Sequence, residues 1–443
     1  MVFGVRASKY RHIYTEPPKP EQCWTGLRLS IATGEQQYVK ASSKYFAVAL
    51  SGAGGPLAIQ RLDLPNRYTP DSCPIICGHA GSLLDFDWNP FDAGMIATAS
   101  DDTTVKIWKV DADGEEWGGR VLSEPLVDLR GHRKKVSLLR YHPTASNVLA
   151  SASTDTTVRV WDVEKAEEIS VFEGLTDIPQ DVVWDHRGDQ YAVSSKDKHV
   201  RLIDGRTSVE SHSFLAHEGT KSTKLSYLHP GDNRILSMGF TQRSGRELKV
   251  WDLRDTSAPV YSETIDQAAG VIMPFYDIDS SVLYLCGKGD GNIRYYEYNT
   301  GEKALYSIGM FQTTISCKGM CVVPKRAVDV GNNETARLLK ITRDGVTPLS
   351  FIVPRKSDTF QEDLFPDCPA AVPAHTADEW VGGSSLDPVT MSLDPADAGN
   401  GAETSTTKKF QVRGAAQLKV ELNEALERIK YLESKLTEAS VKY

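Results

Sequence analysis

Two segments of this chain repeat each other closely enough to dictate the kind of fold it can adopt. Residues 77–110 and 130–163 each begin near a Gly-His pair, continue through two strand-like runs, and finish with Asp-Thr-Thr-Val shortly before a Trp. The His and the Trp are equally far apart in both segments. A self-similar unit of this length with these two ends is typical of one blade of a WD-repeat β-propeller. We therefore expect an all-β ring of such blades.

The polar residues that the two segments share indicate what holds a blade together. The His can bond an Asp in the tight turn and a Ser or Thr on an inner strand, and that hydroxyl can accept the indole N–H of the Trp. A connected polar network inside an apolar blade fixes strand register. Because the set recurs, we interpret it as structural and not as a hydrolase triad. The candidates are His79, Asp102, Thr98 or Ser100, and Trp108, then His132, Asp155, Ser151 or Ser153, and Trp161.

Weaker copies on both sides of this pair bring the expected number of blades to seven. Ile203 replaces the Trp in one copy and Tyr296 replaces it in another. Closing a ring of blades removes exposed sheet edges, so we expect the earliest strand, around 11–14, to pair into the last blade. The remaining copies are residues 24–64, 182–204, 216–252, 274–298 and 317–354.

Several function classes find no support in the sequence. The glycine-rich stretches 51–55 and 287–292 are followed by β-type residues, whereas a phosphate cradle needs a helix N-terminus there, so we predict hairpin turns. The seven cysteines are scattered without zinc-ligand spacing, which predicts reduced thiols. A formal net charge of -9 argues against nucleic-acid binding by bulk charge. We predict no catalytic, metal or cofactor site, and no enzymatic activity.

The cellular compartment is predicted from two absences in the sequence. The chain has no apolar run near the ~18 residues that a membrane span requires, and its first residues lack the apolar region of a signal peptide. We therefore expect a cytoplasmic protein without a membrane span.

Composition changes after the expected propeller, which we place at residues 1–353. Residues 354–385 form a C-terminal extension whose Phe360, Leu364 and Phe365 should pack across a neighbouring surface. A helical turn ended by glycine follows, with Trp380 as its anchor. Residues 386–410 are small and polar with Pro and Gly, so we predict a flexible linker.

The last segment, residues 411–443, has the 4, 3 spacing of apolar residues that predicts an α-helical coiled coil. Ile at a and Leu at d favour two strands, whereas Leu426 at e widens the stripe and favours more. A helix folded back on the propeller stays an alternative. Arg428 and Glu433 would pair between neighbouring chains. The predicted oligomerisation residues are Leu418, Leu422, Ala425, Arg428, Ile429, Leu432, Glu433 and Leu436.

Several stretches in order along nearly the whole chain resemble coronins. They include "RASKYRH", "GHRKKV", "LYLCGKGDGNIRYYE", "VPRKSDTFQEDLFPD" and the terminal heptads. The resemblance implies a single seven-bladed propeller with a C-terminal extension and a coiled coil. It also implies binding to filamentous actin, bundling, work with the nucleating complex of actin-related proteins, and a place in the actin cytoskeleton at the cell cortex. "RIKYLE" (428–433) matches the trimer motif of coronin coiled coils, so a trimer is favoured and a dimer or tetramer stays open.

The candidate actin-binding residues are basic. Arg28 aligns with the actin-contacting arginine of coronins, and residues 1–28 hold five basic residues against two acidic ones. A positive patch would steer binding to an acidic filament. The candidates are Arg28, Arg6, Lys9, Arg11, Lys134 and Lys135.

Three hypotheses follow for the function. The first is an actin-filament binder that cross-links filaments because the coiled coil joins several propellers. The second is a scaffold or adaptor, unrelated to actin, for complex assembly or vesicle trafficking, which would need a separate docking motif. The third is a propeller enzyme, which would need unrepeated acids or metal ligands at the central channel.

Overall fold

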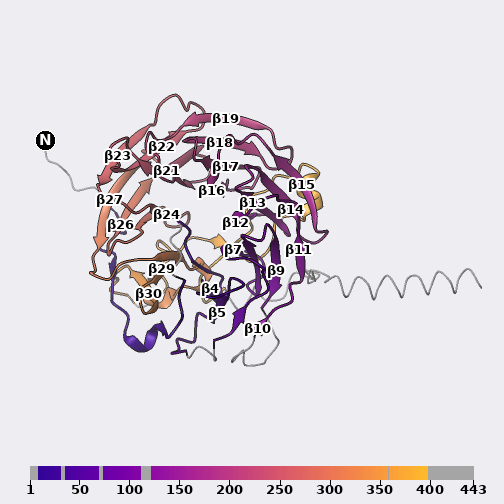
Figure 1. Ribbon diagram of the computed structural model, residues 1–443. Helices are drawn as coiled ribbons and strands as arrows, with labels where there is room; N and C mark the ends of the chain where they lie inside the picture. The colour runs from indigo at the N-terminus through magenta and orange to yellow at the C-terminus, as the bar shows by residue number, and fades with distance from the viewer. Residues whose placement is uncertain (1–7, 31–34, 69–72, 111–120, 358, 398–443) are drawn as a thin grey trace, which may run out of the picture.

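The computed structural model describes residues 8–30, 35–68, 73–110, 121–357 and 359–397, and it confirms the predicted ring (Figure 1). Seven sheets stand around a central channel as the blades of a β-propeller. The first strands of successive blades are neighbours all the way round, including β28 beside β3. In the described part of the chain, helix is limited to the short elements η1 (Pro20–Gln22), η2 (Lys325–Ala327), η3 (Val330–Asn332) and α1 (Ala377–Val381).

The first three blades contain the two strong repeats. Their inner strands have small residues, as in "MIATAS" and "VLASAS", that are buried along their whole length because neighbouring blades cover both faces of each sheet. The strands are β3 (Val39–Ala41), β4 (Tyr45–Ala49), β5 (Leu57–Arg61) and β6 (Ile75–Ile76); then β7 (Leu83–Trp88), β8 (Met95–Ser100), β9 (Val105–Lys109) and β11 (Val127–Leu129); then β12 (Val136–Tyr141), β13 (Val148–Ser153), β14 (Val158–Asp162) and β15 (Glu167–Phe172).

The next three blades are regular four-stranded meanders although their repeats are weak. The glycine-rich stretches 51–55 and 287–292 connect β4 to β5 and β25 to β26, which confirms that both are hairpin turns. The strands are β16 (Pro179–Trp184), β17 (Gln190–Ser195), β18 (His199–Asp204) and β19 (Glu210–Leu215); then β20 (Lys224–Tyr227), β21 (Arg234–Phe240), β22 (Arg246–Asp252) and β23 (Tyr261–Asp266); then β24 (Ile272–Asp277), β25 (Val282–Gly287), β26 (Ile293–Asn299) and β27 (Ala304–Phe311).

The seventh blade closes the ring with N-terminal strands, as predicted. Its own strands are β28 (Gly319–Val322), β29 (Glu334–Ile341) and β30 (Gly345–Ile352). Two short strands from the start of the chain, β1 (Tyr14–Thr15) and β2 (Trp24–Thr25), pair antiparallel with opposite ends of β30. The first blade also gains a strand from elsewhere, since β10 (Val121–Leu122) pairs in parallel with β6.

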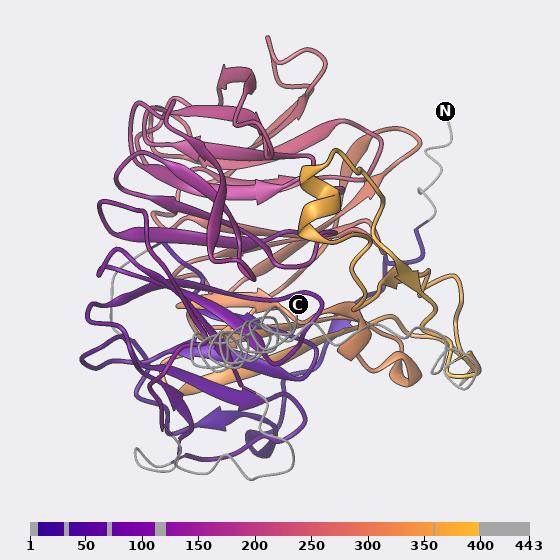
Figure 2. The same ribbon diagram turned by 90° about the vertical axis from the view of Figure 1, so that its right-hand side faces the viewer.

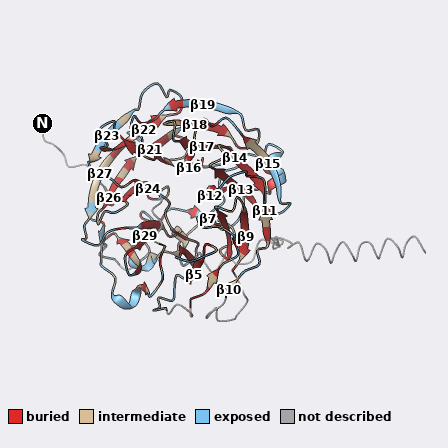
Figure 3. Ribbon diagram, in the orientation of Figure 1, coloured by how far each residue is buried: buried red, intermediate tan, exposed pale blue. Residues whose placement is uncertain are grey.

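The core is divided between the blades. Seven clusters of buried apolar side chains fill the described structure, each between neighbouring blades. Burial falls from the inner strands to the outer ones, and the outer strand β19 is largely exposed (Figure 3). Tertiary packing between sheets therefore stabilises each blade, whose isolated sheet would be marginal.

The C-terminal extension lies along one face of the ring, which we call the extension face (Figure 2). Leu364 and Phe365 are buried in the cluster between the sixth and seventh blades. Trp380 in α1 is fully buried in the cluster between the third and fourth blades. The packing expected of Phe360, Leu364 and Phe365 and the anchor role expected of Trp380 are both confirmed.

The extension continues beyond the boundary that the sequence predicted at residue 385. β32 (Thr390–Met391) pairs with β31 (Cys368–Pro369), and the Asp387 carboxylate accepts a hydrogen bond from Arg187 Nε at 2.7 Å. Residues 386–397 are therefore held on the propeller, and assigning them to the linker was wrong. Their small and polar composition resembles a linker because backbone pairing, one ion pair and the packing of a single leucine, Leu393, hold them in place of a continuous apolar face. Residues 398–410 and the predicted coiled coil, 411–443, lie outside the described residues.

Candidate protein-binding site

Hydrogen bonds join the repeated polar residues of the second and third blades. The indole N–H of Trp108 donates to Thr98 Oγ1 at 2.8 Å, and the Thr98 hydroxyl is 2.8 Å from His79 Nε2. His79 Nδ1 is 2.9 Å from the Asp102 carboxylate. The third blade repeats the arrangement with Trp161, Ser151, His132 and Asp155. Of the two hydroxyls considered in each blade, the structure places Thr98 and Ser151 in the network.

In the second blade, the surroundings keep His79 neutral and Asp102 ionised. Burial lowers the pKa of His79, although Asp102 opposes the shift. Burial alone would raise the pKa of Asp102, but hydrogen bonds from Thr104 and from the Ala80 backbone N–H outweigh burial and lower it well below its usual range. A neutral His79 then donates from Nδ1 to the carboxylate and accepts at Nε2 from the Thr98 hydroxyl. These hydrogen-bonded networks are structural, and they leave none of their side chains free to act as a nucleophile.

Weaker blades replace this network in ways that the sequence did not reveal. In the fifth blade His217 bonds Glu247 and Ser237, and Ser237 accepts the Trp251 N–H. In the fourth, Arg201 takes the place of His and binds Asp197 at 2.6 Å. Glu247 was missed because the longer β21–β22 hairpin moves the acid from the turn onto the strand.

Arginine also replaces histidine across a blade boundary. Arg246 of the fifth blade binds Asp290 in the sixth blade at 2.7 Å, and it binds Asp266 at 2.6 Å. The Arg246 side chain is almost fully buried. Two carboxylates around one guanidinium satisfy its donors and offset the desolvation of the charge.

The Arg28 side chain is exposed, and its backbone is held in place by contacts with Leu50 and Ser51. Its carbonyl accepts a hydrogen bond from Ser51 N at 2.8 Å, and the next residue, Leu29, is buried and bridges to Leu50. Ser51 Oγ also donates to the Leu29 carbonyl at 2.9 Å. The Arg28 side chain forms no ion pair with another described residue, so its guanidinium is presented to solvent from a rigid base.

Lys134 and Lys135 lie on the same face of the ring as Arg28. Their carbonyls accept hydrogen bonds from Ser153 Oγ and Thr154 N, which fixes the connection into β12, while both side chains are exposed. In every blade this connection and the turn between the second and third strands share one end, as Arg28 and Ser51 do. We call this end the Arg28 face, defined by Arg28, Lys134 and Lys135.

A direct contact links the two parts of the Arg28 face. The Gln36 side chain, in the connection after Arg28, donates to the Ser137 carbonyl at 2.9 Å. Ser137 follows Lys135 by two residues, so the connections into β3 and β12 are brought together over the second blade. Three of the six basic candidates, Arg28, Lys134 and Lys135, therefore lie on one face of the ring.

The other candidates lie elsewhere. Because β1 runs antiparallel to β30 and Tyr14 opposes Ile352, the residues before β1 emerge at the extension face. Lys9 there donates to the Asp363 carbonyl, and burial lowers its pKa. Arg11 is exposed in the turn just before β1. Arg6 and all eight predicted oligomerisation residues lie outside the described residues.

Sequence reasoning missed two further basic residues near Arg28, Lys134 and Lys135. Arg133 is exposed, and its backbone N–H donates to the Asp155 carboxylate at 2.9 Å. Lys288 lies over the Tyr38 ring at 4.4 Å, and burial lowers its pKa to about 8. The adjacency of Arg133 to Lys134 was a usable signal, whereas only the closed ring brings Lys288 to Tyr38.

Two absences concern the described residues alone. Within them, no group of three His, Cys, Asp or Glu side chains converges as metal ligands would. No helix in the same part of the chain is both long and apolar enough to cross a membrane.

The ring and its repeated His–Asp–Trp networks define a WD-repeat β-propeller protein. Family models agree, since residues 71–109 and 123–162 match the WD domain, G-beta repeat, and residues 346–388 match a type of WD40 repeat. Residues 3–67 match a domain of unknown function, DUF1899.

Individual relatives identify the family within this class. Coronin-A of Dictyostelium discoideum is 35% identical over 447 residues, covering 99% of this chain and 98% of that protein. The coronin-like protein crn1 of Schizosaccharomyces pombe is 37% identical over 88% of this chain, which spans 64% of the relative's length. The crystal structure of the WD40 domain of Toxoplasma gondii coronin superposes with a TM-score of 0.82 at 34% identity, covering 87% of this chain and 98% of that chain. The chain belongs to the coronin family.

Proposed function

We propose that this coronin binds filamentous actin through the Arg28 face of its propeller and cross-links filaments by self-association of residues 411–443. It does so in the cytoplasm as a non-enzymatic protein of the actin cytoskeleton. The observation that carries the proposal is the exposed Arg28, the residue that the coronin resemblance aligns with the family's actin contact.

The local structure around Arg28 supports a binding role. Ser51 and Leu50 fix the backbone on both sides of Leu29, so little conformational entropy of the backbone would be lost when Arg28 binds a partner. Arginine can bind a carboxylate through two parallel hydrogen bonds, which suits recognition of an acidic protein surface. Lys134, Lys135 and Arg133 add exposed positive charge that would speed association.

Cross-linking requires more than one propeller in each particle. A face that contacts a filament weakly gains avidity of about 10²–10⁴ when copies are linked, with no new contact. The heptads of residues 411–443 would supply that link, and residues 398–410 would connect it to the propeller. Engagement of the actin-nucleating complex belongs to the same proposal and is implied by the coronin resemblance alone.

Co-sedimentation of the full-length protein with actin filaments tests the proposal. Arg28→Asp should weaken co-sedimentation by about tenfold or more, as expected when a central interface arginine is reversed in charge. Lys356→Asp is the matched control, because Lys356 is an exposed residue of the C-terminal extension and undergoes the same change of charge.

The outcomes separate the hypotheses. If wild-type protein fails to co-sediment, this chain is not an actin-filament binder, and the scaffold hypothesis replaces the proposal. If Arg28→Asp and Lys356→Asp behave alike, actin binding stands but the Arg28 face is the wrong surface. Thermal unfolding of both variants should match that of wild type, which excludes misfolding as the cause.

A further inference from the structure

The part of the C-terminal extension that follows Lys356 is strongly acidic. Residues 357–397 contain nine Asp and Glu residues and no Lys or Arg. Ion pairs to the propeller or to the start of the extension use three of these carboxylates, those of Asp363, Asp378 and Asp387. Residues 357–397 supply no cation of their own to balance the remaining negative charge, so this segment would attract a basic partner.

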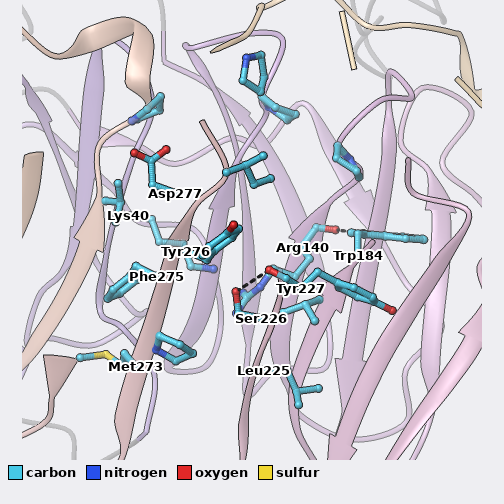
Figure 4. Close-up of a pocket in the computed structure, with 18 of the residues that line it drawn as sticks. Lys40, Arg140, Trp184, Leu225, Ser226, Tyr227, Met273, Phe275, Tyr276 and Asp277 are labelled. Carbon is cyan, nitrogen blue, oxygen red and sulfur yellow. Dashed lines mark hydrogen bonds between the residues drawn. The ribbon is translucent and has the colours of Figure 1, made fainter. Parts of the chain in front are cut away.

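A cavity of about 590 Å³ occupies the channel of the ring (Figure 4). Residues from both ends of the inner strands line it, from Gln36 before β3 to Asp279 after β24, so it extends along the channel. At the extension face its rim includes Pro369 and Pro388 of the extension. Prolines at the rim give it rigid apolar walls.

Most charges in the cavity are paired. Lys40 binds Asp85 at 3.1 Å, and Arg140 binds Asp85 at 3.2 Å and Asp181 at 3.1 Å. Figure 4 shows Lys40, Arg140 and Asp277 around the cavity, and Asp277 is paired with Lys325. These ion pairs neutralise the charged side chains in the middle of the channel. One carboxylate, at the end of the channel on the extension face, is left without an ion-pair partner.

Asp279 is that unpaired carboxylate. It lines the cavity at the extension face but forms no hydrogen bond or ion pair with any other described residue. Burial and the charge of the neighbouring Asp277 raise its pKa to about 7, although Lys325 opposes the shift. Cys368 and Arg326 are also near this site.

A second set of unsatisfied polar atoms lines the same cavity from the fourth and fifth blades. The buried hydroxyl of Tyr227 has no hydrogen-bond partner among the described residues, and neither has Asp185 Oδ1. Burial and the charge of Asp189 raise the pKa of Asp185 to about 6. Asp185 Oδ1 is therefore free to accept a hydrogen bond from a donor that enters the cavity.

We propose that the extension-face end of the channel is a binding site for the ammonium group of a lysine side chain, presented by a basic polypeptide segment. The ammonium would bind Asp279, its methylenes would lie against the proline rim, and Asp185 would accept a hydrogen bond from a further donor of the segment. The site is independent of actin binding by the Arg28 face.

A polypeptide fits the surroundings better than a free amine does. Val372, Leu386, Val389 and Met391 of the extension are exposed apolar residues close to Pro369 and Pro388 in sequence. Such residues would pack on the backbone and side chains that flank the lysine, and the acidic extension would attract further basic residues. A free amine would use the ammonium contact alone.

Titration of the full-length protein at pH 7.5 and low salt, followed by saturation-transfer NMR, tests the site. The probes are the peptide acetyl-Ala-Ala-Lys-Ala-Ala-amide, its norleucine analogue, and cadaverine. The lysine peptide should bind, and norleucine should remove binding because it lacks the ammonium. Asp279→Asn should weaken binding of the lysine peptide by about tenfold, while Asp367→Asn, an exposed acid of the extension, should leave it unchanged.

Three results would overturn the proposal. Equal binding to Asp279→Asn and Asp367→Asn would mean that bulk negative charge attracts the peptide, and absence of binding would remove the site. Cadaverine binding as tightly as the lysine peptide would show a small-cation site and refute the polypeptide assignment. Because Asn keeps the size of Asp, matching thermal midpoints of the two variants would show that the fold is intact.

Discussion

Tyr14 lies directly opposite Ile352, so the first strand of the chain pairs with the last strand of the propeller. The neighbouring pair, Thr15 and Phe351, continues the register. The seventh blade is therefore completed from the opposite end of the sequence, and the ring cannot close until both ends are present. Phe351 is fully buried against Tyr284 of the sixth blade, which couples closure to the core.

At strand β1, which closes the ring, a charged side chain should be tolerated at the exposed position 14 but not at the adjacent buried position 13. Ile13 is buried in the cluster between the sixth and seventh blades, whereas Tyr14 is 41% exposed. Ile13→Asp should lower the free energy of unfolding by about 3 kcal/mol or more, because it buries an unpaired carboxylate. Tyr14→Asp should cost about 1 kcal/mol or less. Denaturant unfolding of the two variants would contradict the closure role of β1 if both changed stability equally.

The polar network of the third blade should be sensitive at its hydroxyl. Ser151 accepts the Trp161 N–H and bonds His132, so Ser151→Ala leaves two buried polar groups without partners. The expected loss of unfolding free energy is about 2–6 kcal/mol, from about 1–3 kcal/mol for each of the two groups. Ser137→Ala in the same blade removes only a 3.5 Å contact and should be nearly neutral. A small effect at Ser151 would mean that water replaces the hydroxyl.

Much of this fold was predictable because its determinants are local in sequence. The spacing of His79 and Trp108, repeated by His132 and Trp161, set the blade, and the need to close the ring predicted pairing around Tyr14. The Arg246–Asp290 pair could not be predicted in this way, because it joins two different blades. β10 was missed for a related reason, since two residues pairing with another blade give no periodic signal.

The candidate site was less predictable than the fold. Basic composition grouped Arg28 with Lys9, but the antiparallel pairing of β1 with β30 sends Lys9 to the extension face. Lys9 and Arg28 are close in sequence, but the chain passes from one face of the ring to the other between them. Sequence proximity therefore gave a wrong prediction that they share one face. Asp279 gave no signal either, because only the packed channel shows that this carboxylate lacks a partner.

Docking of the extension should weaken at acidic pH. His375 Nε2 is 3.2 Å from Thr144 Oγ1, and His375 Nδ1 is 3.3 Å from Ser384 Oγ. Burial and Arg206 lower the pKa of His375, although Glu379 and Asp189 oppose the shift. Because its folded pKa lies below the unfolded value of about 6.5, the stabilisation is present above pH 6.5 and is lost as the pH falls below it.

Hydrogen exchange can measure this loss. The backbone amides around Trp380 should exchange faster at pH 5 than at pH 7.5, once each rate is corrected for the intrinsic chemical exchange rate at that pH. The buried His142, whose pKa burial lowers to about 3, should add to this loss at all pH values between about 6.5 and 3, pH 5 included. His375→Gln should reduce the difference between the two pH values, and equal protection at both in wild type would contradict the prediction.

The lysines of the Arg28 face should contribute to the rate and salt dependence of actin binding. Lys134→Glu with Lys135→Glu should weaken co-sedimentation by about three- to tenfold at low salt. The difference should shrink at high salt, because exposed charges are screened. Lys44→Glu with Lys356→Glu is the control, since both residues are exposed and Lys44 lies in the turn between β3 and β4, at the opposite end of its blade. Equal losses in the two double variants would indicate non-specific charge attraction.

Self-association should depend on the heptad seam of residues 411–443. The heptad pattern predicts Ile429 at an a position, where a carboxylate would be buried between helices, so Ile429→Asp should leave a particle of 48.8 kDa in analytical ultracentrifugation, lighter than wild type. Ser434→Asp adds the same charge at an f position, away from the seam, and should preserve the wild-type mass. Filament bundling, seen by low-speed sedimentation, should be lost with Ile429→Asp and kept with Ser434→Asp, because a single propeller can occupy one filament but cannot join two. Bundling by a monomeric Ile429→Asp variant would show that one propeller contacts two filaments by itself.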